Sequence, residues 1–107
     1  MHEYNKSPSE FEVQSLAFGI LRKNLYPAYH IRGEYKFPTM RADIAIFKNS
    51  PDGNHQPVLL LEVKKSPTGE STSQGKRYES VVGVPCLYIR GYQEAYKVME
   101  LVHPYLT

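Results

Sequence analysis

Two carboxylates and a lysine lie in segments of the chain that are otherwise apolar. Asp43 falls within RADIAIFK (residues 41–48), and Glu62 and Lys64 close the run PVLLLEVKK (residues 57–65). Residues two apart on a strand point to the same face, so Glu62 and Lys64 should lie side by side. Buried charges are costly unless they are paired or bind a metal. The three side chains therefore indicate a functional site at the end of a buried strand.

This set of residue types is suited to phosphodiester hydrolysis. If the turn-rich segment 49–57 joins antiparallel strands, Asp43 and Glu62 lie on neighbouring strands about 5 Å apart between backbones. Two carboxylates and a backbone carbonyl, here that of Val63, are the hard oxygen ligands preferred by Mg²⁺ and Mn²⁺. Such an ion binds a phosphate oxygen and activates water. Lys64 would orient or deprotonate that water, or stabilise the developing charge.

The same residues also have ordinary structural interpretations. Asp43 would then be an acid at a strand end that pairs with Arg41. Glu62 and Lys64 would be a solvated cross-strand pair. The apolar residues that precede Glu62 disfavour an exposed edge, so the sequence favours the functional interpretation.

The chain pattern predicts the order helix, three strands, helix, strand, helix. Ser7-Pro8-Ser9-Glu10 is typical of a helix start, and the apolar spacing that follows is helical. Helices are expected at about 8–24, 71–82 and 92–104, and strands at about 28–37, 41–48, 57–65 and 86–90. Gly83 would end the middle helix. This order indicates an α/β or α+β domain with a mixed central sheet flanked by helices.

Alternation within these segments predicts which side chains share a face. In the first strand the even steps place together Ile31, Tyr35 and Phe37. In the second strand one face would carry Ala42, Ile44 and Ile46, and the other Asp43, Ala45 and Phe47. The apolar face of the last helix would comprise Ala95, Val98, Met99 and Val102.

Length and composition set limits on the kind of protein. The 107 residues suffice for one domain over 1–107, and the polar residues 1–7 are expected to be flexible. Net charge is only +2, so any nucleic-acid binding would need a local basic cluster. Cys86 is the single cysteine, which excludes a disulfide framework and fits a reduced compartment. No signal region or membrane span is evident, so we expect a cytoplasmic protein.

The order of motifs resembles that of the PD-(D/E)XK nuclease superfamily. Asp43 is followed by an 18-residue gap and then by Glu62-Val63-Lys64, and α-β-β-β-α-β is the superfamily's minimal core. RADIAIF, PVLLLEVKKS and SQGKRYESVVGVP are similar to the N-terminal nuclease domain of type I restriction enzyme R subunits. Those domains carry a Gln-x-x-x-Tyr motif, which Gln74 and Tyr78 match. Ala42 departs from the pattern by replacing the usual proline.

The resemblance implies a restriction-endonuclease-like fold, a divalent metal (Mg²⁺, with Mn²⁺ as a substitute) and hydrolytic cleavage of DNA. It implies that Asp43 and Glu62 bind the metal and that Lys64 is the catalytic lysine. Gln74 and Tyr78 would contact the DNA backbone or order the site. By themselves, residues at this spacing are more often ordinary surface and core contacts, and only the sequence context favours the functional interpretation. Many members carry an acid on the first helix, for which Glu12 is our choice and Glu10 the competitor.

Further basic residues predict how DNA would be held. A phosphate-facing cluster is expected from Lys64, Lys65, Lys76, Arg77 and Arg41, with a solvated surface as the alternative. So small a domain would cover one scissile bond, so cutting both strands favours a homodimer or a larger partner protein. Tyr92, Tyr96 and Tyr105 are a candidate dimer surface. The rival hypotheses are a catalytically silent nucleic-acid-binding or accessory module and a purely structural domain.

Overall fold

The computed structural model describes residues 8–38, 41–49, 56–64 and 83–106. Within these ranges the chain forms α1 (Pro8–Leu25), β1 (Tyr29–Lys36), β2 (Arg41–Lys48), β3 (Pro57–Lys64), β4 (Cys86–Arg90), α3 (Gly91–Tyr96), α4 (Val98–Val102) and the 3₁₀ turn η1 (His103–Tyr105). The helix predicted at 71–82 and the flexible segment 1–7 lie outside the described residues. The first predicted helix and the four predicted strands are present, with boundaries within a few residues of those expected.

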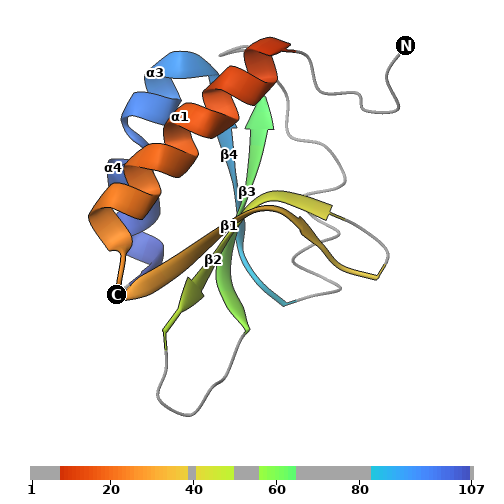
Figure 1. Ribbon diagram of the computed structural model, residues 1–107, viewed down its shortest axis with the longest axis vertical. Helices are drawn as coiled ribbons and strands as arrows, with labels where there is room; N and C mark the ends of the chain where they lie inside the picture. The colour runs from red at the N-terminus through yellow and green to blue at the C-terminus, as the bar shows by residue number, and fades with distance from the viewer. Residues whose placement is uncertain (1–7, 39–40, 50–55, 65–82, 107) are drawn as a thin grey trace.

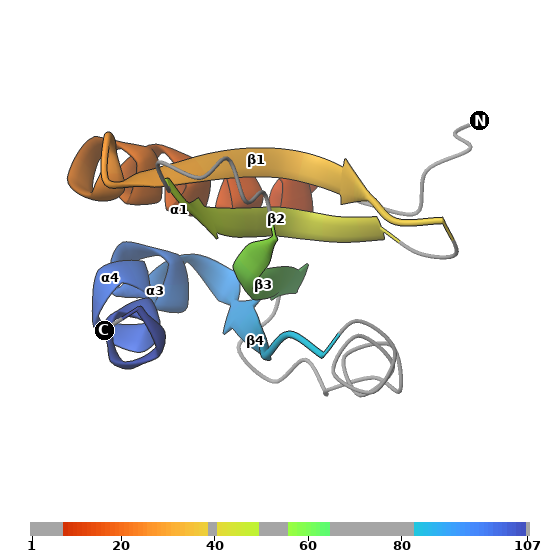
Figure 2. The ribbon, with the colours of Figure 1, turned by 90° about the horizontal axis from the view of Figure 1, so that it is seen from below.

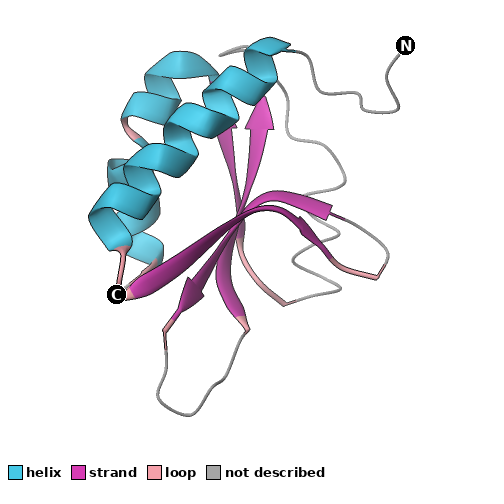
Figure 3. Ribbon diagram, viewed as in Figure 1, coloured by secondary structure: helices cyan, strands magenta, loops and turns pink. Residues whose placement is uncertain are grey.

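The four strands form one sheet in the order β1-β2-β3-β4 (Figures 1 and 3). β1 pairs with β2 and β2 with β3 in antiparallel fashion, whereas β3 and β4 are parallel. The sheet is therefore mixed, as the sequence predicts. β3 is the most apolar strand and lies between β2 and β4, which explains why its residues from Leu59 to Val63 are buried.

The described helices pack on one face of this sheet (Figures 1 and 2). α1 contributes Val13, Ala17 and Leu21 to the core, which follows from their helical spacing. They meet sheet residues that include Ile44 and Leu61. Burial of these side chains is the main favourable term that holds α1 against the strands.

A smaller apolar cluster occupies the opposite face of the sheet. Its buried members are Ala42, Ala45, Phe47, Leu60 and Val84, and Tyr35, Phe37 and Cys86 pack against them. The ring of Tyr35 meets those of Phe37 and Phe47 edge-on, with centroids 5.1 Å apart in both pairs. Aromatic side chains thus cover the part of this face that is contributed by β1 and β2.

The predicted alternation is wrong near Glu34 and Asp43. The β1–β2 register pairs Gly33 with Ile44 and Tyr35 with Ala42, and it omits the position between them, Glu34 opposite Asp43. Glu34 has a φ of 52°, a left-handed conformation that interrupts regular pleating. Consequently Tyr35, Phe37 and Ala42 pack in the second cluster, although Ile31, Ile44 and Ile46 pack against the helices.

The single C-terminal helix predicted at 92–104 is also wrong. α3 and α4 are separate short helices that meet at Lys97, whose backbone (φ −100°, ψ 15°) lies outside the helical region. The Lys97 N–H bonds to the Glu94 carbonyl three residues back, which closes α3. Pro104 then falls in η1 because it has no N–H with which to continue an α-helix. The predicted apolar face persists, with Ala95, Val98 and Val102 buried.

Among the described residues, none of the helices has the length and apolar character required to cross a lipid bilayer.

The packing predicts that the central strand dominates stability. Leu61 is fully buried between the sheet and α1, so Leu61→Ala should lower the free energy of unfolding by about 2–5 kcal/mol. Leu101 on α4 is 37% exposed, and Leu101→Ala should cost less than about 1 kcal/mol. Urea denaturation followed by circular dichroism measures both. Equal losses in the two variants would contradict the assigned core.

Candidate functional site

Asp43 lies where the β2–β3 ladder ends. The last paired residues are Ile44 and Leu61, one position before Asp43 would meet Glu62. There the Val63 N–H donates a hydrogen bond of 2.8 Å to Asp43 Oδ2. A carboxylate oxygen thus bonds the backbone of β3 beyond the last ladder pair. The bond fixes the Asp43 carboxylate beside the peptide that joins Glu62 to Val63.

Glu62 and Lys64 are placed on the same face of β3 as Leu60, which packs in the second cluster away from α1. Asp43 and Glu62 are each only 8% exposed, whereas Lys64 is half-buried. The structure therefore brings the three predicted residues together at one edge of the ladder. The solvated interpretation of Glu62 does not hold, because its side chain is buried.

The donor set fits a divalent cation. It combines the carboxylates of Asp43 and Glu62 with the adjacent carbonyl of Val63, all of them oxygen ligands of the kind that Mg²⁺ binds together with water and substrate oxygens. Glu62 Oε2 is buried and accepts no hydrogen bond from the described residues, although Glu62 makes another interaction. Two buried carboxylates in one place repel each other unless a proton or a cation intervenes.

Gln14 on α1 joins the helix to this site. Its side chain is buried, and Nε2 donates to the Asp43 backbone carbonyl at 3.2 Å and to Glu34 Oε2 at 2.9 Å. Glu34 Oε1 in turn lies 3.4 Å from Arg41 Nε. Gln14 thus contacts both residues at the position that the β1–β2 register omits, and fixes the backbone that carries the Asp43 side chain.

Sequence reasoning missed Gln14 and Glu34. A signal for Gln14 was present, because it directly follows Val13 and precedes Ala17 by three residues, on the apolar side of the helix. A polar side chain on that side needs a buried partner. Glu34 had no comparable signal, since its role depends on a backbone conformation that the sequence does not reveal.

Glu12 is not grouped with Asp43 and Glu62. It is exposed on α1, and its Oε1 accepts a hydrogen bond from the Tyr92 hydroxyl on α3. The described part of the chain holds no cluster of three His, Cys, Asp or Glu side chains arranged to bind a metal. In this structure Glu12 therefore connects two helices, away from the carboxylates of Asp43 and Glu62 on the strands.

The structure describes some of the remaining predicted site residues and not others. Arg41 begins β2 and is half-buried beside Glu34. Five predicted DNA-contacting residues fall outside the described ranges: Lys65, Gln74, Lys76, Arg77 and Tyr78.

Comparison with known proteins establishes the fold. No protein-family model matches the chain, and no curated protein matches it. A solved structure described as a VRR_NUC domain aligns with a TM-score of 0.56 and 14% sequence identity, over 88% of this chain and 97% of the other. The protein thus has a fold like that of the VRR_NUC domain, a restriction-endonuclease-like α+β arrangement of a mixed sheet with flanking helices.

The Gln14 contacts predict a measurable cost for losing its amide. Gln14→Leu keeps a similar volume but removes the donor shared by the Asp43 carbonyl and Glu34, so it should lower the free energy of unfolding by about 1–3 kcal/mol. Gln93→Leu, the same change at an exposed position of α3, should alter it by no more than about 0.5 kcal/mol. Urea denaturation compares them. Similar effects in both variants would show that Gln14 does not fix the site.

The bond between α1 and α3 predicts a shifted titration. The hydrogen bond to Glu12, assisted by desolvation and the negative charge of that carboxylate, raises the pKa of Tyr92 above its ordinary value of 10.0. The stabilisation from this bond is present below about pH 10 and is lost as pH rises through the raised pKa. NMR titration of labelled tyrosine rings should show the Tyr92 pKa falling in Glu12→Gln. An unchanged pKa in that variant would contradict the contact.

Proposed function

We propose that this protein is a metal-dependent endonuclease that hydrolyses phosphodiester bonds in DNA. The observation that supports it most is the bond from the Val63 N–H to Asp43, which fixes one buried carboxylate next to the segment of β3 that carries the buried Glu62 and Lys64. A nuclease-type fold and a donor set of hard oxygens agree with this chemistry. Mg²⁺ is the proposed ion, and Mn²⁺ should replace it.

Each residue has a distinct role in the proposal. Asp43, Glu62 and the Val63 carbonyl would hold the cation, which when bound supplies charge neutralisation at the phosphate and activates water. Lys64 donates hydrogen bonds to the attacking water or to a non-bridging phosphate oxygen and offsets the charge that develops there. Gln14 positions Asp43 through its backbone carbonyl.

The outer residues are proposed to bind the DNA backbone. Arg41 lies beside the site at the start of β2, and the cluster proposed with it comprises Lys65, Gln74, Lys76, Arg77 and Tyr78. Glu12 would join the metal site only by exchanging its bond to Tyr92. Cleavage of both strands would require a homodimer or a larger partner protein, which we propose for duplex substrates. The proposed setting is the cytoplasm.

Metal binding tests the donor set independently of activity. Titration calorimetry with Mn²⁺ should show one binding event per chain in the wild type and a loss of at least about tenfold in affinity for Asp43→Asn. Asparagine retains an oxygen that can accept the Val63 N–H, so this variant should stay folded. Glu100→Gln removes an exposed acid on α4 and should leave the affinity unchanged. Binding that survives Asp43→Asn would rule out the assigned site.

Cleavage of supercoiled plasmid tests the reaction. The wild type should nick plasmid in Mg²⁺ or Mn²⁺ and not in EDTA, and Lys64→Ala should reduce the rate by about 100-fold or more. Glu100→Gln serves as the matched surface control and should cut at the wild-type rate. Metal binding without cleavage of plasmid, single strands or branched DNA would favour the silent binding module. Equal cutting by wild type and Lys64→Ala would contradict the role of Lys64.

A further inference from the structure

Two cations flank one aromatic ring beside the proposed metal site. Lys64 Nζ lies 5.9 Å and Arg90 Cζ 5.1 Å from the centroid of the Tyr88 ring. Both distances are within the range at which a cation is attracted to the face of an aromatic ring. All three residues are half-buried. The ring therefore holds two long, flexible side chains close to one another.

The parallel β3–β4 register creates this arrangement. It pairs Glu62 with Tyr88 and Lys64 with Arg90, so the four side chains lie on one face of two neighbouring strands. Asp43 is on the next strand in the order, on the other side of β3. From β2 to β4, the neighbouring strands carry in turn Asp43, then Glu62 and Lys64, and then Tyr88 and Arg90.

The chemistry of the Arg90 side chain suits an anionic ligand. Arg90 is paired in register with Lys64, and neighbouring carboxylates offset part of the charge of the two cations. Two carboxylates are close by: Glu62, opposite Tyr88, and Glu94, whose Oε1 accepts the Arg90 backbone N–H at 2.7 Å. One oxygen of Glu94 is thus engaged by backbone at the start of α3. A guanidinium fork matches the geometry of a phosphate group.

We propose that Arg90 forms a phosphate-binding site next to Lys64, and that Tyr88 is the residue that positions both side chains. This inference rests on the proposed nuclease function and specifies how the substrate is held. Since β4 lies beyond β3 as seen from Asp43, the phosphate bound by Arg90 is a neighbour of the one that is hydrolysed. Arg90 accordingly contributes to binding the polynucleotide backbone, without reading its bases.

Salt-dependent binding provides the test. Fluorescence anisotropy with a short fluorescein-labelled DNA duplex in EDTA, over a series of NaCl concentrations, reports backbone contacts while no cleavage occurs. Arg90→Gln should reduce the slope of log affinity against log salt by roughly one and weaken binding about three- to tenfold at moderate salt. Arg90→Lys keeps the charge and should keep the slope.

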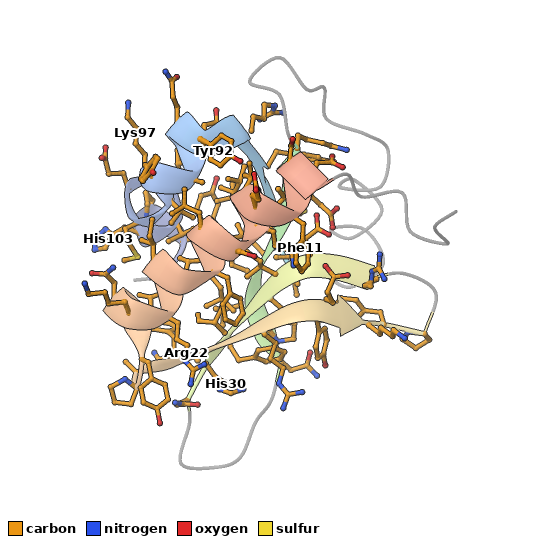
Figure 4. All side chains as sticks on the ribbon, turned by 45° about the horizontal axis from the view of Figure 1, so that its top comes forward. Phe11, Arg22, His30, Tyr92, Lys97 and His103 are labelled. Atoms are coloured by element: carbon orange, nitrogen blue, oxygen red, sulfur yellow. The ribbon has the colours of Figure 1, made fainter. Side chains whose placement is uncertain are left out.

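A matched control uses an arginine that lies away from Tyr92, which is two residues after Arg90. Arg22 is exposed in the last turn of α1, and Figure 4 shows it far from Tyr92 on α3. Arg22→Gln makes the same change in net charge and should leave the slope unchanged. An equal fall of slope in Arg22→Gln and Arg90→Gln would show a general charge effect and would overturn the inference.

Tyr88→Leu separates positioning from folding. This variant removes the ring and should lose slope and affinity as Arg90→Gln does, with circular dichroism verifying its fold. Wild-type binding with an unchanged slope in Arg90→Gln would overturn this inference and leave the nuclease proposal intact. A wild type that neither binds nor cuts DNA would instead overturn the proposed function, and this inference with it.

Discussion

The site depends on one hydrogen bond, from the Val63 N–H to the Asp43 carboxylate. β2 and β3 are regularly paired up to Ile44 and Leu61, and beyond that point a side chain takes part in joining the two strands. This arrangement satisfies a backbone donor that would otherwise be left in a buried place. It also keeps a carboxylate next to Glu62, at the cost of placing two acids together. A cation at this point would offset that cost.

The helices stabilise this arrangement from the other face of the sheet. α1 is fixed by Val13, Ala17 and Leu21 in the main core, and through Gln14 it contacts the backbone of Asp43. The left-handed Glu34 and the omitted register position lie at the same place. Local irregularities of strands are frequently found beside functional sites, where they re-aim a side chain. Here the irregularity and the predicted metal ligand coincide at Asp43.

Much of the architecture followed from local patterns. The apolar run before Glu62 predicted a central buried strand, and the turn-rich segment before it predicted the antiparallel β2–β3 pair, both of which the structure contains. The errors have physical causes. Ala42 and Tyr35 lie on the face of the sheet opposite to the predicted one, because Glu34 adopts a left-handed conformation that regular strand alternation does not include. The last predicted helix is interrupted at Lys97, because the Lys97 N–H bonds to the Glu94 carbonyl and ends α3 there. A second short helix, α4, then continues over the core.

The sequence by itself determined which residue types are available for the proposed site: an aspartate and a glutamate in apolar strands, and a lysine two positions after the glutamate. These follow from residue type and short spacing, which are local properties. Only the tertiary structure decided that Gln14 reaches Asp43, that Glu12 bonds Tyr92, and that Arg90 lies beside Lys64 over the ring of Tyr88. The contacts of Gln14 with Asp43, of Glu12 with Tyr92 and of Lys64 with Tyr88 join residues 29, 80 and 24 positions apart in the chain. They depend on strand register and helix packing, which no local pattern encodes.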